Sequence, residues 1–387
     1  MKKLTYAIIG TGMMGQEHLR NLALVRSLNH LDLQVNVLVD PDDSMRKSAH
    51  ALATELGNDQ VQAYDSIDAA PLQEVDAFVI VSPNFTHHET ITRLMATGKA
   101  ILAEKPLCTT LAQCDDILTR LEDYPAPFWV AMEYRYMPPT ARFLERLRSD
   151  EIGTLRMLSI KEHRYPFLEK VDDWNRFSEN TGGTLVEKCC HHFDLMRLIT
   201  TSEPLRIYAS GAIDVNHRDE RYAGRTPDII DNALVIVDFE NGVRASLELC
   251  MFAEGAEPQE QITAIGERGK LDAYIPGPDR FWPDAGERHA KVVFSPRDQS
   301  APQSDVVAVD AALAAAGDHH GSTYYQHVRF AQTLISDAPV EVTAADGAIA
   351  VMMGAAAQES IRTGQAVDIR TFSQLAQNPL ANQSNHR

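Results

Sequence analysis

The chain has 387 residues, of which 44% are apolar and 23% charged, as is typical of soluble globular proteins. Its length predicts two or three domains. With 36 Lys and Arg against 54 Asp and Glu, the formal net charge is −18, which argues against a nucleic-acid-binding surface and against binding to an anionic membrane.

The N-terminal apolar run ends at Gly10, too early for a signal peptide, and no run of about 18 apolar residues predicts a membrane span. The cysteines number five, an odd count, and none of them forms a CxxC motif. This usage favours a reducing compartment, so we expect a cytoplasmic protein.

Up to about residue 130, short apolar runs alternate with segments of helical periodicity. The runs expected to be strands are 4–9, 33–39, 77–81, 100–103 and 128–132, and helices are expected at 44–56, 88–96 and 107–121. This alternation predicts βαβ units and a doubly wound parallel sheet, an α/β domain over residues 1–130.

From residue 131 the pattern changes to longer runs in which apolar and polar residues alternate. Strands are expected at 155–162, 205–209, 233–239, 245–251, 261–265 and 270–274, helices at 140–148, 190–199, 324–335 and 344–362, and a loop at 276–319. The alternation predicts an α+β domain over 131–372 with an open, largely antiparallel sheet. One face of that sheet is expected to be free and to form a homodimer or homotetramer, and residues 373–387 to be a polar tail.

The run Gly10-Thr11-Gly12-Met13-Met14-Gly15 fits the GxGxxG pattern, between an apolar strand and a helix. In such a loop Gly10 permits the tight turn, Gly12 lets the backbone approach a pyrophosphate, and Gly15 lets the helix pack on the strand. The helix N-terminus then holds the phosphates through its free N–H groups.

Asp40 ends the next strand, where its carboxylate would accept hydrogen bonds from the ribose hydroxyls and repel a 2′-phosphate. The nearest cations, Arg46 and Lys47, follow a helical turn or more later. We therefore expect NAD rather than NADP as the cofactor.

Cysteines and histidines gather at Cys189-Cys190-His191-His192, but adjacent side chains point in different directions and no second ligand pair with metal-site spacing is present, so no metal is expected. On a single helix, Glu187, His191 and Asp194 would share one face and place a general base beside carboxylates. The alternative is a structural helix with a buried histidine.

Together these motifs resemble the glucose–fructose oxidoreductase and inositol dehydrogenase family (Gfo/Idh/MocA) over about residues 4–370. Ser82-Pro83-Asn84 with His87 is similar to the family's TPNxxH element, Glu104-Lys105-Pro106 to its EKP signature, and the stretch from Gly182 to Asp194 to its GG…DxGxHxxD helix. The resemblance implies a cofactor site made of Gly10, Gly12, Met13, Met14, Gly15, Asp40, Ser82, Asn84, His87, Glu104 and Lys105.

By the same resemblance the catalytic residues are Lys105, Glu187 and His191. Glu187 stands where the family has Asp, and Cys189 where it has Gly. The sequence resembles sugar-active members, and the expected substrate residues are His163, Arg164, Lys170, Trp174, Asn175, Arg176 and Tyr324. The expected activity is NAD-dependent oxidation of a hydroxyl of a sugar or cyclic polyol.

Two alternatives stay open. Some relatives are NAD-dependent glycosidases, which oxidise the sugar, eliminate the aglycone, add water and reduce the sugar again, so that NAD is recycled. If this chain is such an enzyme, an anionic sugar such as a sulfoquinovoside would suit it as the substrate. The fold also serves as a non-catalytic NAD-binding regulator, but the presence of Lys105, Glu187 and His191 argues against that function.

Overall fold

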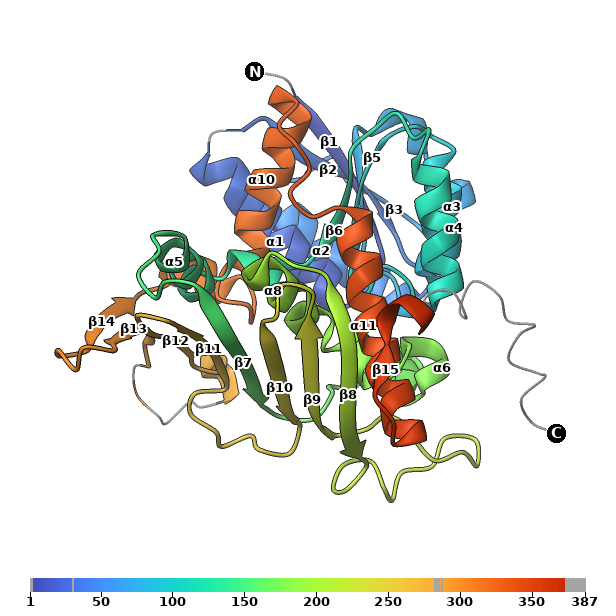
Figure 1. The fold of residues 1–387 in the computed structure, drawn as a ribbon. Helices are drawn as coiled ribbons and strands as arrows, with labels where there is room; N and C mark the ends of the chain where they lie inside the picture. The colour runs from blue at the N-terminus through green and yellow to red at the C-terminus, as the bar shows by residue number, and fades with distance from the viewer. Residues whose placement is uncertain (1–2, 30, 282–285, 287, 373–387) are drawn as a thin grey trace. The chain divides into compact units, whose positions relative to one another are not determined.

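The computed structural model describes residues 3–29, 31–281, 286 and 288–372, and the chain divides into two compact units (Figure 1). Unit 1 holds the described residues up to 108 together with 113–136 and 309–348, and unit 2 holds 109–112, 137–308 and those from 349 onward. The predicted tail, 373–387, lies outside the described residues.

Unit 1 contains a sheet of six parallel strands in the order β3-β2-β1-β4-β5-β6. The strands are β1 (Leu4–Ile9), β2 (Leu33–Val39), β3 (Gln62–Tyr64), β4 (Ala77–Ile80), β5 (Ala100–Glu104) and β6 (Phe128–Ala131). β4, β5 and β6 are buried along their whole length, as the continuous apolar runs predict for a sheet covered on both faces. The strand order reverses between β1 and β4, so the carboxyl ends of these two strands mark the ligand side of the sheet.

The helices of unit 1 follow the strands as expected for a doubly wound fold. They are α1 (Met13–Leu28), α2 (Asp43–Glu55), α3 (His87–Met95) and most of α4 (Leu111–Leu121), with 3-10 turns η1 (Ile67–Ala69), η2 (Leu72–Glu74), η3 (Asn84–Thr86) and η4 (Glu133–Tyr136). The side chain of Asp42 accepts a hydrogen bond from Met45 N and so caps α2. The prediction of a helix from residue 107 is wrong by one turn, since α4 begins at Leu111.

A late segment of the chain completes unit 1. Helices α9 (Ala311–Ala315) and α10 (Ser322–Ser336) belong to it, and α10 packs on α1 (Figure 1). The ring of Phe330 lies edge-on to Tyr6 of β1 and Trp129 of β6, with centroids 6.3 and 6.1 Å apart. The unit is therefore discontinuous in sequence, unlike the predicted contiguous division near residue 130, because α10 buries an apolar surface that the first 136 residues leave uncovered.

Unit 2 contains a sheet of nine strands in the order β14-β13-β12-β11-β7-β10-β9-β8-β15, antiparallel except for the pair β7 and β10. Its strands are β7 (Leu155–His163), β8 (Pro204–Ala212), β9 (Asn232–Phe239), β10 (Arg244–Cys250), β11 (Glu260–Gly266), β12 (Gly269–Ile275), β13 (Ala290–Pro296), β14 (Gln303–Val307) and β15 (Val367–Asp368). The predicted fold class, a Rossmann sheet and a largely antiparallel α+β sheet, is confirmed.

The helical elements of unit 2 are shorter, apart from α11. They are α5 (Pro138–Arg148), α6 (Ser178–Thr181), α7 (Thr184–Glu187), α8 (Cys190–Thr200), most of α11 (Ala344–Thr363), and the 3-10 segments η5 (Val171–Arg176) and η6 (Asp279–Phe281). α8 packs on β7, and α5 packs on β12, β13 and β14.

The prediction of a loop over 276–319 is wrong in part, because β13, β14 and α9 lie within it. β13 pairs with β12 on one side and with β14, the edge strand of the sheet, on the other. Such edge strands owe their order to cross-strand pairing more than to a local pattern, so the sequence carries little signal for them.

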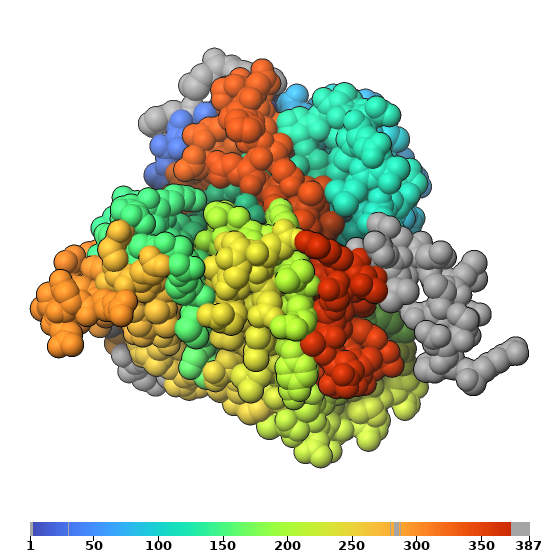
Figure 2. Space-filling model, viewed as in Figure 1, coloured from blue at the N-terminus to red at the C-terminus, as the bar shows by residue number. Residues whose placement is uncertain are grey.

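One face of the unit 2 sheet carries exposed apolar side chains on neighbouring strands. Tyr208 of β8 pairs with Ile236 of β9, and these residues and Leu234 are 44%, 52% and 60% exposed. Figure 2 shows side chains of β7, β8, β9 and β10 at the surface on this side.

No helix in the described part of the chain combines the length and the apolar character needed to cross a membrane.

Candidate functional site

The glycine loop lies at the carboxyl ends of β1 and β4. Gly10 has a φ of 97°, and a Cβ on it would lie 2.6 Å from the backbone of Ser82, so only glycine fits there. A Cβ on Gly15 would lie 2.3 Å from Gly10 O. Gly12 differs, since no heavy atom lies within 4 Å of its ideal Cβ position. Gly10 and Gly15 are thus fixed by the fold, whereas Gly12 faces open space where a pyrophosphate can approach the backbone.

The first turn of α1 fits an anion. Gly12 is the N-cap residue, no side chain caps the helix, and the first turn holds no acidic residue. The first N–H groups of α1 are therefore not bonded by a side-chain cap, and the helix dipole favours negative charge there. Met13 is exposed beside them, and Met14 lies in the same turn. This end of α1 suits the phosphates of NAD.

Asp40 follows β2 and is held against the glycine loop. Its Oδ2 accepts hydrogen bonds from the backbone N and the hydroxyl of Thr11, at 2.6 and 3.1 Å, and its Oδ1 accepts one from Asp42 N. Arg46, one of the nearest cations in the sequence, donates from Nη1 to Asp40 O at 2.7 Å. Since Arg46 also pairs with Asp43 at 2.8 Å, its charge is largely balanced.

Ser82, Asn84 and His87 follow β4. The side-chain nitrogen of Asn84 is buried and has no partner among the described residues, so it can donate to a bound group. His87, in contrast, is fully buried, with Nδ1 2.8 Å from Pro106 O and Nε2 3.0 Å from Ser82 O. The structure thus places His87 as a tie between the loops after β4 and β5, not as the predicted cofactor ligand.

Glu104 ends β5, and Lys105 follows it. Glu104 Oε2 accepts a hydrogen bond from Lys105 N at 3.2 Å, and Oε1 lies 3.0 Å from His18 Nε2. Burial raises the pKa of Glu104, but the hydrogen bond with His18 and the charges of His18 and Lys105 outweigh it, so the pKa lies below its ordinary value. The group beside Lys105 is a carboxylate.

Sequence reasoning missed Glu133, which follows β6 at the same edge of the sheet as Lys105. Its side chain is 1% exposed. Burial, and then the charge of Glu104, raise the pKa of Glu133 to about 7, although Lys105 and His319 act in the opposite direction. The sequence signal for Glu133 is weak, because a Glu two residues after a strand is ordinarily a surface residue.

In unit 2, Gly182 and Gly183 set the start of the segment that carries Glu187 and His191. Both have positive φ, and a Cβ on Gly183 would lie 1.8 Å from Oε1 of Gln358 on α11. Gln358 also donates to Gly182 O at 2.7 Å. The glycine pair therefore lets α11 fix the backbone immediately before α7.

The prediction that Glu187, His191 and Asp194 share one helix is wrong. Glu187 ends α7, and His191 and Asp194 lie on α8, with Lys188 and Cys189 as a turn between the two helices. All three side chains are nevertheless buried.

A charged cluster, also missed, anchors this segment to the sheet. Glu162 of β7 is fully buried, with Oε1 2.9 Å from Lys188 Nζ and 3.3 Å from Arg164, and Oε2 3.3 Å from His192 Nε2. Burial raises the pKa of Glu162, but Lys188, Arg164 and His192 hold it well below its ordinary value. Lys188 lies directly between α7 and α8, so the pair with Glu162 positions Glu187 and His191. The alternation Leu158, Ile160, Glu162 on the inner face of β7 was an available signal.

Among the other predicted substrate residues, His163 ends β7 opposite Cys250, the last residue of β10, and the rest follow it in the chain. His163 Nε2 lies 3.0 Å from Glu248, Arg164 covers the ring of Tyr165, and Lys170 and Trp174 are half-buried.

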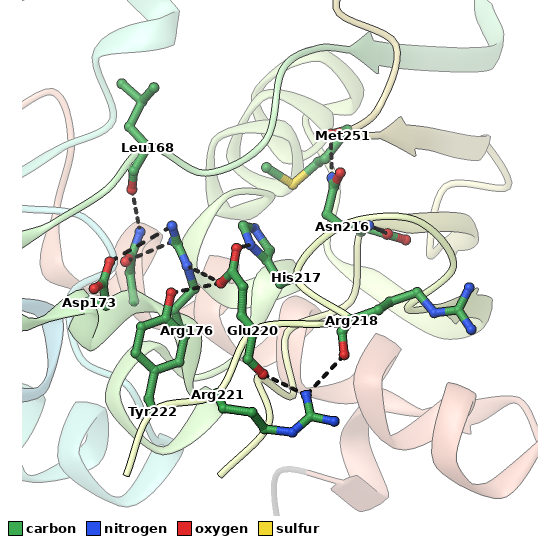
Figure 3. A network of polar contacts seen from close by, with 12 residues as sticks. Leu168, Asp173, Arg176, Asn216, His217, Arg218, Glu220, Arg221, Tyr222 and Met251 are labelled. Carbon is green, nitrogen blue, oxygen red and sulfur yellow. Dashed lines mark hydrogen bonds and ion pairs between the residues drawn. The ribbon is translucent and has the colours of Figure 1, made fainter. Parts of the chain in front are cut away.

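Arg176 is instead buried in a structural network, shown in Figure 3, and Asn175 is buried as well. Arg176 donates to Glu220 at 3.2 Å and to Asn175 at 3.1 Å, while Asn175 donates to Leu168 O. Glu220 also accepts from Tyr222. These contacts tie η5 to the β8–β9 loop, so the structure gives Asn175 and Arg176 a different use from the predicted sugar contact.

Tyr324 does not lie with the substrate residues of unit 2. It is on α10 in unit 1, and its hydroxyl accepts a hydrogen bond from Asn29 at 2.8 Å. Asn29 ends α1 at the opposite end from the glycine loop. The prediction of Tyr324 as a substrate residue is therefore not supported.

In the described part of the chain, no group of three or more His, Cys, Asp or Glu side chains is arranged to hold a metal ion.

Comparison with known proteins gives two adjoining matches. Residues 4–132 match the model of the Gfo/Idh/MocA oxidoreductase family, NAD-binding Rossmann fold, and residues 145–369 match that of its C-terminal alpha/beta domain. The chain belongs to the Gfo/Idh/MocA oxidoreductase family. It is an NAD-binding oxidoreductase, as the glycine loop and Asp40 predict.

Two relatives and one solved structure are similar to this chain. An uncharacterised oxidoreductase of Bacillus subtilis, YrbE, is 24% identical, over 97% of this chain and 99% of the relative. Inositol 2-dehydrogenase of Rhizobium meliloti is 27% identical, over 69% of this chain and 74% of the relative. The crystal structure of an Agrobacterium radiobacter oxidoreductase with NAD+, L-tartaric acid and magnesium has a TM-score of 0.76 at 16% identity, over 96% of this chain and 99% of that chain.

Proposed function

We propose that this Gfo/Idh/MocA protein oxidises a secondary hydroxyl of a cyclic polyol or sugar, with Lys105 and His191 acting on the reacting oxygen. The observation that carries the proposal is Lys105 beside an ionised Glu104 at the edge of the sheet that also bears the open Gly12 backbone. Relatives named as inositol dehydrogenases support a polyol substrate.

The residues that would hold NAD are those at the carboxyl ends of the strands. The backbone of Gly12 and the first turn of α1 bind the pyrophosphate, Asp40 accepts hydrogen bonds from a ribose, and the buried amide of Asn84 donates to the bound cofactor. NAD supplies the acceptor for the hydride that leaves the substrate carbon.

The chain supplies the proton chemistry. His191 accepts the hydroxyl proton of the substrate, so that the C–O double bond can form as the hydride leaves. Lys105 donates a hydrogen bond to the same oxygen and stabilises its developing negative charge. Glu187, positioned through the Lys188–Glu162 pair, orients His191 or binds a neighbouring hydroxyl.

We also propose that two copies of the chain associate through the exposed face of the unit 2 sheet, where Tyr208, Leu234 and Ile236 lie together. A contiguous apolar face on adjacent strands suits a two-fold symmetric contact.

Turnover with a substrate panel tests the activity. The protein with NAD+ is offered myo-inositol, scyllo-inositol, glucose, alkyl glucosides and a sulfonated glucoside, while NADH fluorescence and released alcohol are measured. Stoichiometric NADH from a free polyol or sugar is the expected result. Alcohol release without NADH would instead establish the redox-neutral glycosidase.

Two variants test the residue roles. Lys105→Ala and His191→Ala are expected to lower kcat by about 10³-fold while NAD+ binding persists. Lys47→Ala and His88→Gln are matched controls on α2 and α3 with wild-type turnover expected. Near wild-type rates in both site variants would overturn the assignment.

A further inference from the structure

A chain of buried hydrogen-bonding groups leads from α10 to Lys105. Nε2 of His327 on α10 lies 2.7 Å from Nδ1 of His18 on α1, and Nε2 of His18 lies 3.0 Å from Oε1 of Glu104. The other carboxylate oxygen of Glu104 accepts from Lys105 N. Both histidine side chains are fully buried, and 309 residues separate them in sequence.

The charge of Glu104 fixes which atoms carry protons. An ionised carboxylate only accepts, so Nε2 of His18 must donate to it. In a His18 ring that carries its single proton at Nε2, the lone pair lies at Nδ1, 2.7 Å from Nε2 of His327, from which it accepts a hydrogen bond. Burial, followed by the nearby His18, holds the pKa of His327 well below its ordinary value, so His327 is neutral. Every donor in the chain therefore points toward Glu104.

Other titratable groups face this chain from neighbouring elements. On α1, Glu17 accepts a hydrogen bond from Thr323 and lies 3.0 Å from Nδ1 of His319, so it is paired away from the chain. Glu133 follows β6, and the charges of Glu104, Lys105 and His319 shift its pKa. His18 bonds the side chain of Glu104 directly.

We propose that His18 and His327 are positioning residues, which hold Glu104 as an oriented carboxylate and so fix the place of Lys105. Their importance for catalysis rests on the proposed function of Lys105, whereas the chain of hydrogen bonds from His327 to Glu104 does not depend on that function. Without His327, His18 loses the donor to Nδ1 and its ring can rotate. Without His18, Glu104 loses the hydrogen bond that lowers its pKa against the effect of burial. The late segment 309–348 would then complete the lysine site as well as the fold of unit 1.

The tautomers of the two histidines test this inference without substrate. In protein labelled with ¹⁵N histidine, long-range ¹H–¹⁵N spectra between about pH 6 and pH 8 should show both rings protonated at Nε2 and not at Nδ1. His18→Phe and His327→Phe assign the signals. A proton on Nδ1 of His18, or a charged His18, would overturn the direction of the chain and with it the proposal.

The state of Glu104 provides a second, independent readout. Infrared spectra at about pH 6 should show a new carboxylic acid band in His18→Phe that is lost in the double variant His18→Phe/Glu104→Gln. Both variants are compared in a Glu133→Gln background, because the charge of Glu104 raises the pKa of Glu133 and the two acid bands would otherwise change together. His88→Gln is the matched control, because His88 pairs with Asp116 outside the chain. An unchanged spectrum in His18→Phe would contradict the proposal.

Kinetics connect the chain to catalysis. On the polyol that turns over best, His327→Phe is expected to lower kcat by about tenfold with NAD+ affinity within twofold of wild type, since misplacing Lys105 affects the reacting oxygen first. His327→Gln, which keeps a donor, should recover part of the loss. If no polyol is oxidised, the proposed function fails while the tautomer and infrared results still decide the inference.

Discussion

At the scale of single residues, some glycines of the GxGxxG loop are required by the fold and another by the ligand. Gly10 and Gly15 have backbone atoms where a side chain would be, and Gly12 has none within 4 Å. The first two serve the fold, and the third serves the ligand.

This difference predicts opposite phenotypes for two similar substitutions. Gly15→Ala should lower the free energy of unfolding by about 2 kcal/mol, because its Cβ meets Gly10 O. Gly12→Ala should unfold like the wild type but bind NAD+ at least about tenfold more weakly, a loss of roughly 1.4 kcal/mol. Urea unfolding and calorimetric NAD+ titration of both variants measure these effects. Equal stability of the two variants would contradict the steric argument.

Glu133 predicts a pH dependence of stability. Its pKa rises from 4.5 to about 7 on folding, so the folded chain binds more protons than the unfolded chain between these values. The corresponding stability is present at low pH and is lost as the pH rises through about 7, by roughly 3 kcal/mol.

Glu133→Gln should therefore gain stability relative to wild type at about pH 8 and not at about pH 4. Urea unfolding at both pH values checks this, with the exposed Glu122→Gln as control. A wild-type difference between the two pH values that persists in Glu133→Gln would assign it to another group.

At the scale of elements, charged pairs with at least one buried partner join segments that have little regular structure of their own. The Glu162–Lys188 pair connects β7 to the junction of α7 and α8, and the Arg176–Glu220 pair connects η5 to the β8–β9 loop (Figure 3). In both cases a buried partner would be left uncompensated by the loss of the other.

Arg176→Met should lower the free energy of unfolding by about 2 kcal/mol, since it removes the hydrogen bonds that Arg176 donates to the buried Asn175 amide oxygen and to Glu220. Limited proteolysis should then cut the β8–β9 loop faster. Arg362→Met removes an exposed pair with Glu359 and should change stability by less than about 0.5 kcal/mol. Equal effects of the two changes would show that burial of Arg176 is unimportant.

At the scale of the whole molecule, the exposed sheet face of unit 2 predicts self-association (Figure 2). The wild type should have two or four times the mass of one chain by light scattering. Leu234→Lys with Ile236→Lys should shift it toward the single chain, because two charges on β9 oppose burial of the face.

Leu28→Lys, at an exposed apolar position of unit 1, is the control. A wild type that is already a single chain at all concentrations tested would rule out this interface.

The sequence by itself determined the two fold types, the glycine loop with Asp40, and the order of the motifs. These features depend on local periodicity and on residue types at short spacing, which the chain displays directly. The same information led to the single helix for Glu187 and His191, which the structure corrects.

Only the tertiary structure decided the partners of the motif residues. It placed α10 on α1 and brought His327 to His18, across 309 residues. It assigned His87, Arg176 and Tyr324 to internal contacts, and it gave Glu104, Glu133 and Glu162 their unusual environments. A pKa or a hydrogen-bond partner depends on burial and on charges that distant segments contribute, and no spacing in the sequence records these.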